Sequence, residues 1–332
     1  MTTRFPLRDA QVQMTLAAIA YAGQGNSPEL HSAPQIRAAI NRQLTAHPEY
    51  ATGSDWSLIW GPEATSLSEN LAYVAYNSAD HTVSVCLRGT IAAVGSVFED
   101  YPLVQVPFPF FNDTGAKVSI DFLYALARIM ALKDGFSGQT IPDAINAFAD
   151  GTPVSRVIVT GHSQGAALTP LMAHALKFGS LGSAAVSAPV SGFAFAPPTP
   201  GNPAFAALVG ESLDCWFVIN PLDLIPLGYC CIRDVIDKGI PEPEGGTTPA
   251  QWAAVAAVVK KAQAEFDKTG PWAQPAQQAR LPRVPLTGDL ISVAGDQHNH
   301  NSYLCLLGAP QTDVGTPSPF PDCPLQDPVI RT

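Results

Sequence analysis

The segment from Arg156 to Phe178 constrains the fold more than any other part of the chain. Residues 156–160 read RVIVT, a short apolar run of the kind that forms a buried strand in a parallel sheet. Gly161 to Gly165 (GHSQG) follow as a sharp turn, and Ala166 to Phe178 are helix-prone. A buried strand, a tight turn and a helix in this order predict an α/β protein with a mostly parallel central sheet flanked by helices.

Other segments fit the same fold class. Two runs rich in aromatic and β-branched residues, 71–77 and 82–87, flank the polar turn 78–81 and predict a hairpin. The remaining predicted elements are strands at 56–60, 192–196 and 215–219 and helices at 37–47, 118–132 and 141–148. Strands that alternate with helices from the middle of the chain onward favour the parallel arrangement.

The two ends and one long interval lie outside this alternating pattern, within what we expect to be one domain over residues 1–332. Residues 14–22 (MTLAAIAYA) predict an Ala-rich N-terminal helix rather than a convincing signal peptide, because the apolar run is short and polar residues interrupt the stretch before it. Residues 237–285 predict an inserted helical segment, with a helix from about 248 to 268. The Pro-rich tail from about 309 is expected to wrap the surface in extended form.

Composition excludes several classes of protein. Of the 332 residues, 46% are hydrophobic and only 14% charged, so the chain can bury a large core. The net charge is −10 and the longest basic run is Lys260-Lys261, which argues against nucleic-acid binding, while the acidic balance and low Lys content favour a secreted protein. No apolar stretch reaches the roughly 18 residues that span a bilayer, and neither GxxxxGK nor GxGxxG is present to predict nucleotide binding.

The six cysteines indicate neither a disulfide scaffold nor a zinc ribbon. They are dispersed along the chain and form no CxxC pair. Cys86 and Cys215 lie in apolar strand-like runs, which predicts buried thiols.

Ser163 is the candidate nucleophile because of its place in the turn between Gly161 and Gly165. Glycines on both sides let the backbone bend tightly and leave the serine oxygen exposed where a strand passes into a helix. The N-terminus of that helix also supplies N–H groups that stabilise developing negative charge. A plain strand–helix turn is the alternative interpretation.

A serine nucleophile needs a base, and the base needs a carboxylate that orients it. Asp223 follows the strand at 215–219 in an apolar loop, where it is well placed to orient an imidazole; an Asx-turn is the alternative. Order alone also allows Asp214, Asp234, Asp237 and Asp289. Only His298 and His300 follow Asp223, so one of them is the predicted base, and the residues by themselves leave the choice open.

A metal site is the alternative use of the same histidines. Asp296, His298 and His300 alternate along the chain in the way that ligands on a strand do. No third histidine or cysteine is obvious beside them to complete such a site, and a serine mechanism requires no cofactor, so we expect neither a metal nor an organic cofactor.

Five blocks of sequence occur in an order that resembles the class 3 lipases, the family of the fungal triacylglycerol lipases within the α/β-hydrolase fold. The blocks are VCLRGT at 85–90, EDYPL at 99–103, GHSQG at 161–165, NPLDLIP at 220–226 and HNSY at 300–303. The last block resembles the terminal H-x-x-Y of the family and thereby favours His300 as the base. The resemblance extends over roughly residues 15–307.

The resemblance implies a catalytic triad of Ser163, His300 and Asp223. It also implies an oxyanion hole formed by Thr90 and by the backbone N–H of Gln164. The second donor agrees with the general expectation that the residue after the nucleophile contributes its N–H group.

The resemblance further implies a lid helix, which would fall at residues 91–98. Two departures leave the lid and the substrate class open. The V-H-x-G-F block of the family is VSIDF at 118–122 here, and the interval 237–285 is long enough to be an alternative lid.

The expected function is therefore that of a serine carboxylic ester hydrolase, most concretely a lipase that cleaves acylglycerol esters through an acyl-enzyme. A short-chain or feruloyl-type esterase is the first alternative. A non-catalytic binding module is the second, although all three triad residues are present. Apolar residues that could face a lipid–water interface, or equally form a core strand, are Val104, Val106, Phe108, Phe110 and Phe111.

Overall fold

The structure is a computed structural model that describes residues 4–22, 32–65, 70–90, 104–110, 115–228, 230, 257, 260, 263–264, 266–326 and 328–332. The predicted lid helix at 91–98 and the acidic stretch at 99–103 lie outside the described residues. Most of the helix expected from about 248 to 268 does so as well.

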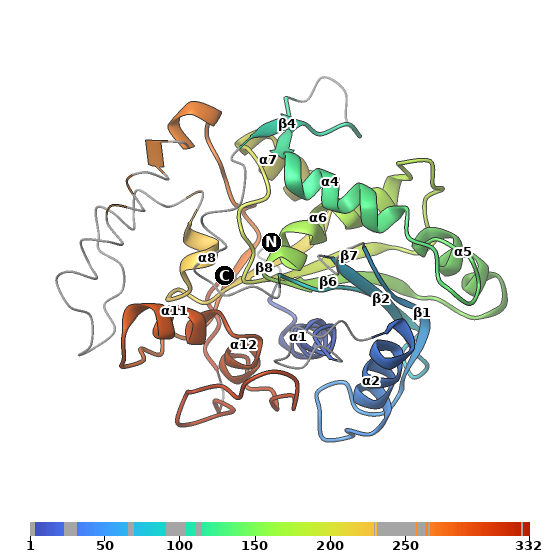
Figure 1. Cartoon of the computed structure of the whole chain (residues 1–332), viewed down its shortest axis with the longest axis horizontal. Coiled ribbons are helices and arrows are strands. Elements are labelled where there is room, and N and C mark those ends of the chain that lie inside the picture. Colours follow the sequence, from blue (N-terminus) through green and yellow to red (C-terminus); the bar gives the residue numbers. More distant parts are fainter. Residues whose placement is uncertain are drawn as a thin grey trace.

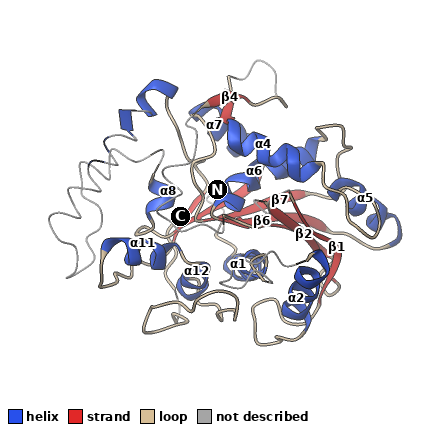
Figure 2. Ribbon diagram, in the orientation of Figure 1, coloured by secondary structure: helices blue, strands red, loops and turns tan. Residues whose placement is uncertain are grey.

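A seven-stranded sheet runs through the centre of the molecule in the order β1-β2-β3-β6-β7-β8-β9 (Figures 1 and 2). Neighbours are antiparallel from β1 to β3 and parallel from β3 to β9, which confirms the predicted mostly parallel sheet. The hairpin predicted at 71–77 and 82–87 is β2 and β3, with Asn77 paired to Thr82. The strands are β1 (Trp56–Ala64), β2 (Leu71–Asn77), β3 (Thr82–Leu87), β6 (Arg156–His162), β7 (Val190–Phe195), β8 (Asp214–Ile219) and β9 (Gln278–Arg280).

Helices cover both faces of the sheet (Figure 1). One face carries α1 (Leu7–Ile19), α2 (Ala33–Thr45), α11 (Leu290–His298) and α12 (His300–Leu306). The other carries α4 (Ile120–Met130), α5 (Ile141–Gly151), α6 (Gln164–Phe178) and α7 (Pro203–Ser212). Every side chain of α1 from Gln13 to Ile19 is buried, because this helix lies between the sheet and α12. The predicted Ala-rich N-terminal helix is thus a core element.

Two short strands differ from the expectations. Residues 117–119 form β5 (Lys117–Ser119), which pairs with β4 (Gln105–Pro107), so the helix expected from 118 begins only at Ile120. Residues 278–280 form β9 at the edge of the main sheet, so the interval 237–285 is not wholly helical. A strand of three residues carries too few side chains to show an alternating pattern.

The C-terminal tail is fastened to α12 and to the sheet edge. Cys305 of α12 forms a disulfide with Cys323 of the tail. Phe320, which precedes Cys323 in the tail, is buried. Near the end of the chain, Arg331 forms a backbone bridge with Arg280 of β9. The tail is therefore attached to α12, the helix that begins at His300.

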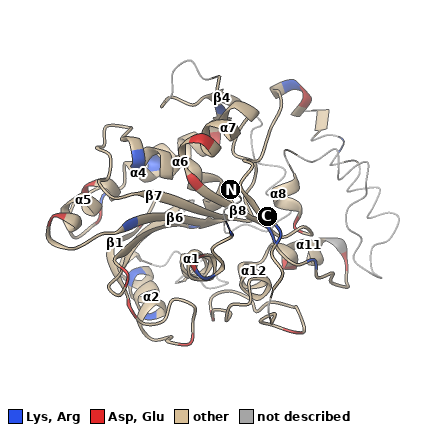
Figure 3. Cartoon of the chain, turned by 180° about the vertical axis from the view of Figure 1, so that it is seen from behind, with Lys and Arg blue, Asp and Glu red and all other residues tan. Residues whose placement is uncertain are grey.

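Charged side chains are few and scattered. Figure 3 shows short blue and red segments distributed over helices and loops in the described part of the chain. Among the described residues, no helix has both the length and the apolar character that a membrane crossing needs.

Candidate active site

Ser163 occupies a strained turn between β6 and α6. Its backbone has φ 58° and ψ −126°, a conformation that non-glycine residues adopt only where the surrounding structure enforces it. The Ser163 N–H donates to the carbonyl of Phe195 at 3.0 Å, which fixes the turn to the end of the neighbouring strand β7. The strand–turn–helix setting predicted from the sequence is confirmed.

The two flanking glycines are required by close backbone contact. A Cβ atom on Gly161 would overlap the backbone of Gly165. A Cβ atom on Gly165 would overlap the Leu87 carbonyl and come within 2.8 Å of its carbon, at the end of β3. These contacts hold the turn, the first residues of α6 and the end of β3 together around Ser163.

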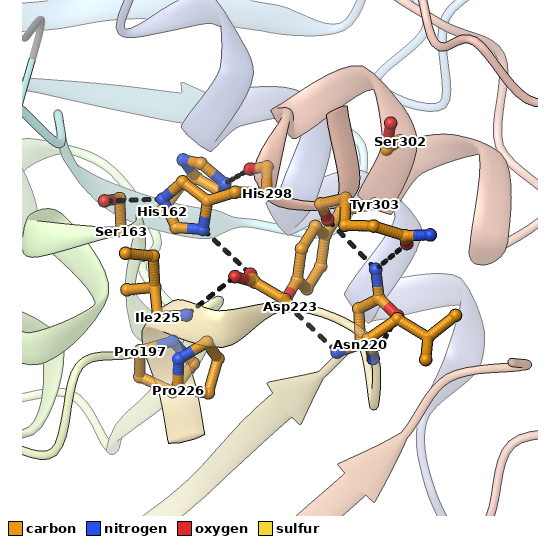
Figure 4. Close-up of polar contacts among 12 residues, drawn as sticks. His162, Ser163, Pro197, Asn220, Asp223, Ile225, Pro226, His298, Ser302 and Tyr303 are labelled. Carbon is orange, nitrogen blue, oxygen red and sulfur yellow. Dashed lines mark hydrogen bonds and ion pairs between the residues drawn. The ribbon is translucent and has the colours of Figure 1, made fainter. Parts of the chain in front are cut away.

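His298, the last residue of α11, lies between Ser163 and Asp223 (Figure 4). Its Nε2 is 2.9 Å from the Ser163 Oγ, and its Nδ1 is 2.8 Å from the Asp223 Oδ2. A carboxylate only accepts hydrogen bonds, so Nδ1 carries the proton and Nε2 is left to accept from the serine hydroxyl. All three side chains are buried, and Asp223 is fully so.

The Asp223 carboxylate is held by three donors. Asp223 is the N-cap of α8 (Leu224–Leu227), and its Oδ1 accepts from the Ile225 N–H at 2.9 Å. Its Oδ2 accepts from the Tyr303 hydroxyl at 2.8 Å as well as from His298. Burial, followed by the nearby Asp223 charge, raises the pKa of Tyr303 well above its ordinary value, so the phenol stays protonated and remains a donor.

Asn220 connects the end of β8 to the end of α11. Its Nδ2 donates to the Gln297 carbonyl at 2.9 Å and to the Gln297 Oε1 at 2.7 Å. Its backbone N–H donates to the Tyr303 hydroxyl at 3.1 Å, and its Oδ1 accepts from the Leu222 N–H at 3.0 Å. Asn220 thereby places the loop that carries Asp223 beside the residue that precedes His298.

His300 does not occupy the position expected of the base, and the choice between the two histidines is corrected to His298. Asn299, with ψ 135°, separates α11 from α12 and caps α12, so the rings on either side of it face different neighbours. The His300 Nε2 donates to the Val314 carbonyl at 2.8 Å. Its ring stacks on Tyr21 with centroids 5.1 Å apart. Burial lowers the His300 pKa to about 4, which keeps this ring neutral.

The alternative metal site has no support in the geometry. Asp296 and His298 lie on a helix rather than at alternating positions of a strand, and both ring nitrogens of His298 face the other two triad residues. Within the described ranges, no group of three or more His, Cys, Asp or Glu side chains could hold a metal ion.

Thr90 and Gln164, the predicted oxyanion-hole residues, lie next to each other. The Thr90 hydroxyl donates to the Gln164 Oε1 at 3.2 Å, and Gln164 is the first residue of α6. Their contribution to oxyanion binding stays a prediction.

Sequence reasoning missed several residues that build the site. Asn220 and Tyr303 belong to the blocks at 220–226 and 300–303, but the sequence alone does not indicate that they position the triad. Tyr21, which contacts His300, carried no functional signal because it lies within the predicted Ala-rich helix at 14–22. The two predicted buried thiols, Cys86 and Cys215, are confirmed: both are buried and neither forms a disulfide.

Comparison with known proteins gives one family match and several structural likenesses. Residues 84–230 match the family model described as lipase (class 3). The fold is similar to that of M37 lipase (TM-score 0.76, 22% identity), over 90% of this chain and 93% of that one. It is also similar to Rhizomucor miehei lipase in a propeptide complex (TM-score 0.50, 22% identity), over 68% of this chain and 64% of that one.

No curated protein matches the chain in sequence. The match over residues 84–230 includes the nucleophile turn and the Asp223 loop, and the structural likenesses show a shared fold across the parallel sheet. Residues 84–230 are therefore similar to the class 3 lipases, and the chain as a whole has the α/β-hydrolase fold.

Proposed function

We propose that this chain is a lipase that hydrolyses the carboxylic esters of acylglycerols, with Ser163 as nucleophile, His298 as general base and Asp223 as the residue that orients the base. The observation that carries the proposal is the continuous line of hydrogen bonds from the Ser163 Oγ through His298 to the Asp223 Oδ2, at 2.9 and 2.8 Å. This arrangement is that of a serine hydrolase triad.

The geometry supports the following reaction. His298 Nε2 takes the hydroxyl proton of Ser163 while Oγ attacks the ester carbonyl, and Asp223 stabilises the imidazolium that forms. His298 then returns the proton to the alcohol that leaves, which produces an acyl-enzyme. Water enters by the same route: His298 removes its proton while the water oxygen attacks the acyl carbon, and His298 then gives this proton to the Ser163 Oγ as the bond to the acyl carbon breaks and the acid departs.

The negative charge on the tetrahedral oxygen needs donors near Ser163. We assign this role to the Gln164 backbone N–H, which lies at the N-terminus of α6, and to Thr90. The hydrogen bond between the Thr90 hydroxyl and the Gln164 side chain supports this assignment, because it brings the loop after β3 up to the nucleophile turn.

A lipid–water interface is the proposed place of action. The support is the family match together with exposed apolar side chains in the described part of the chain, among them Val104, Ile120 and Tyr124. Val104 and Ile120 are joined by a backbone hydrogen bond of 3.0 Å, so these residues belong to one region of the surface.

The test is hydrolysis of p-nitrophenyl esters from acetyl to palmitoyl, measured below and above the solubility limit of each ester, with Ser163→Ala as the matched variant. We expect the variant to lose activity and the wild-type rate to favour long chains and to rise when substrate aggregates. If only short, soluble esters are hydrolysed, the chain is an esterase rather than a lipase. If Ser163→Ala retains full activity, the triad mechanism is wrong.

A further inference from the structure

His162, directly before the nucleophile, has a polar partner on each side of its ring. Its Nε2 lies 2.8 Å from the carbonyl oxygen of His298, the proposed base. Its Nδ1 lies 3.0 Å from the hydroxyl oxygen of Tyr21. The side chain is buried and contributes nothing to the proton transfers proposed above.

The partners fix the direction of these hydrogen bonds. A carbonyl oxygen only accepts, so the Nε2 of His162 carries the proton. Burial, together with the nearby His298 and His300, holds the pKa of His162 well below its ordinary value, so the ring is neutral. The Nδ1 atom then has a lone pair and accepts from the Tyr21 hydroxyl.

The Tyr21 hydroxyl continues the connection to the loop after β3. Its oxygen accepts from the Gly89 N–H at 3.1 Å, and Gly89 immediately precedes Thr90. Gly89 is closely surrounded: a Cβ atom on it would overlap the Tyr21 hydroxyl and lie 2.9 Å from the Ser163 Cβ. The Tyr21 ring itself stacks on His300, so its position is determined by packing as well.

We propose that Tyr21 and His162 are positioning residues that join the oxyanion loop to the backbone of the base, through the series Gly89 N–H, Tyr21 hydroxyl, His162 ring and His298 carbonyl. The inference rests on the proposed function, because it concerns how Thr90 and His298 are held relative to Ser163. Residues that orient catalytic groups in this way act on turnover more than on substrate binding. Neither side chain needs to touch the substrate.

The first test is Tyr21→Phe, which removes the hydroxyl and keeps the ring that stacks on His300. The matched control is Tyr73→Phe, because the buried Tyr73 hydroxyl also makes a hydrogen bond, to the Leu16 carbonyl at 2.6 Å, away from the triad. We expect Tyr21→Phe to lower kcat about tenfold with KM changed less than twofold, by analogy with the residues that orient metal ligands through a hydrogen bond. Tyr73→Phe should retain the wild-type kcat.

The second test separates the two halves of the series. His162→Leu removes both hydrogen bonds, whereas His162→Gln places an amide N–H near the position of Nε2 and can still donate to the His298 carbonyl. We expect kcat to fall about 100-fold in His162→Leu and to recover about tenfold of that loss in His162→Gln. The affinity of an alkyl boronic acid, which forms a tetrahedral adduct with the serine, should fall with kcat/KM in the same order.

Two results would overturn the inference. One is equal kcat for Tyr21→Phe and Tyr73→Phe; the other is a loss in His162→Leu that appears in KM alone. If His162→Leu does not fold, Tyr21→Phe and His162→Gln decide the matter. An active Ser163→Ala would refute the proposed function instead, so the two failures are distinguishable.

Discussion

Ser163 is held by backbone atoms that touch, whereas His298 is held by side chains from distant parts of the chain. Around Ser163, close backbone contacts join the turn at 161–165 to the end of β3, and the Ser163 side chain does not cap α6. Around His298, the residues that determine its position come from the loop after β8, from α12 and from the C-terminal tail.

The tail side of this second region is defined by Asn301. Its Nδ2 lies within hydrogen-bond distance of the carbonyls of Thr312, Val314 and Thr316, and its Oδ1 accepts from the Thr312 N–H at 3.0 Å. Together with the disulfide between Cys305 and Cys323, these bonds fasten α12 to the tail.

The difference shows that one triad can combine two kinds of construction. The nucleophile turn depends on the absence of side-chain atoms, so adding a single carbon should damage it. The base depends on many hydrogen bonds of moderate strength, so each can be weakened separately. Variants in each of the two regions can test this contrast between backbone contacts and side-chain hydrogen bonds.

The largest effect is expected from His298→Ala compared with His300→Gln. Removing the base from a triad costs roughly 10³-fold or more in kcat. His300→Gln keeps a donor that can reach the Val314 carbonyl, so we expect it to retain at least a tenth of the wild-type kcat. Steady-state kinetics on a soluble ester measures both.

The same pair of variants can contradict the assignment of the base. If His300→Gln loses as much activity as His298→Ala, the hydrogen bonds of His298 to Ser163 and Asp223 do not identify the base. A fully active His298→Ala enzyme would remove that residue from the triad.

The next effect concerns the backbone contacts of the nucleophile turn. Gly165→Ala places a Cβ atom against the Leu87 backbone, which cannot move aside as a side chain would, and should lower the free energy of unfolding by about 3 kcal/mol. Gly210→Ala in α7 is the matched control, because a Cβ atom there meets nothing within 4 Å. The control should gain up to about 1 kcal/mol in a urea titration. Equal stabilities would show that close packing is not what shapes the turn.

This contrast also explains which parts of the site could be predicted from the sequence. The turn around Ser163 is local: an apolar strand, two glycines and a helix are contiguous, so their chemistry can be read in order. Asp223 likewise lies in the short loop after its strand β8. The Ser163 assignment therefore needed no knowledge of the tertiary structure beyond a parallel sheet, whereas for Asp223 the order of residues left other aspartates possible.

The base could not be predicted in the same way. His298 and His300 are two residues apart, and their different roles arise because Asn299 ends one helix and begins another. That break is fixed by bonds from Asn299 and Asn301 to residues 312–316, which are separated from it in sequence. The position of β9 raises the same difficulty, since it is defined by pairing with β8 rather than by its own three residues.

The smallest effect concerns acid stability, and it should affect the base region more than the turn. The pKa of His300 is about 4 in the folded chain, mainly because of burial, and about 6.5 in an unfolded one. Between these values the unfolded state binds the extra proton, so stability present above pH 6.5 is lost as the pH falls toward 4, by up to about 3 kcal/mol. His300→Gln lacks this group, so its deficit in the free energy of unfolding relative to the wild type should shrink by about 2 kcal/mol between pH 7.5 and pH 5.

The matched control is Gly165→Ala, whose deficit should stay constant over the same range because its origin is steric. Urea titrations of the three proteins at both pH values measure this, and a His300→Gln deficit that does not change with pH would show that a buried neutral imidazole is not what makes the base region sensitive to acid.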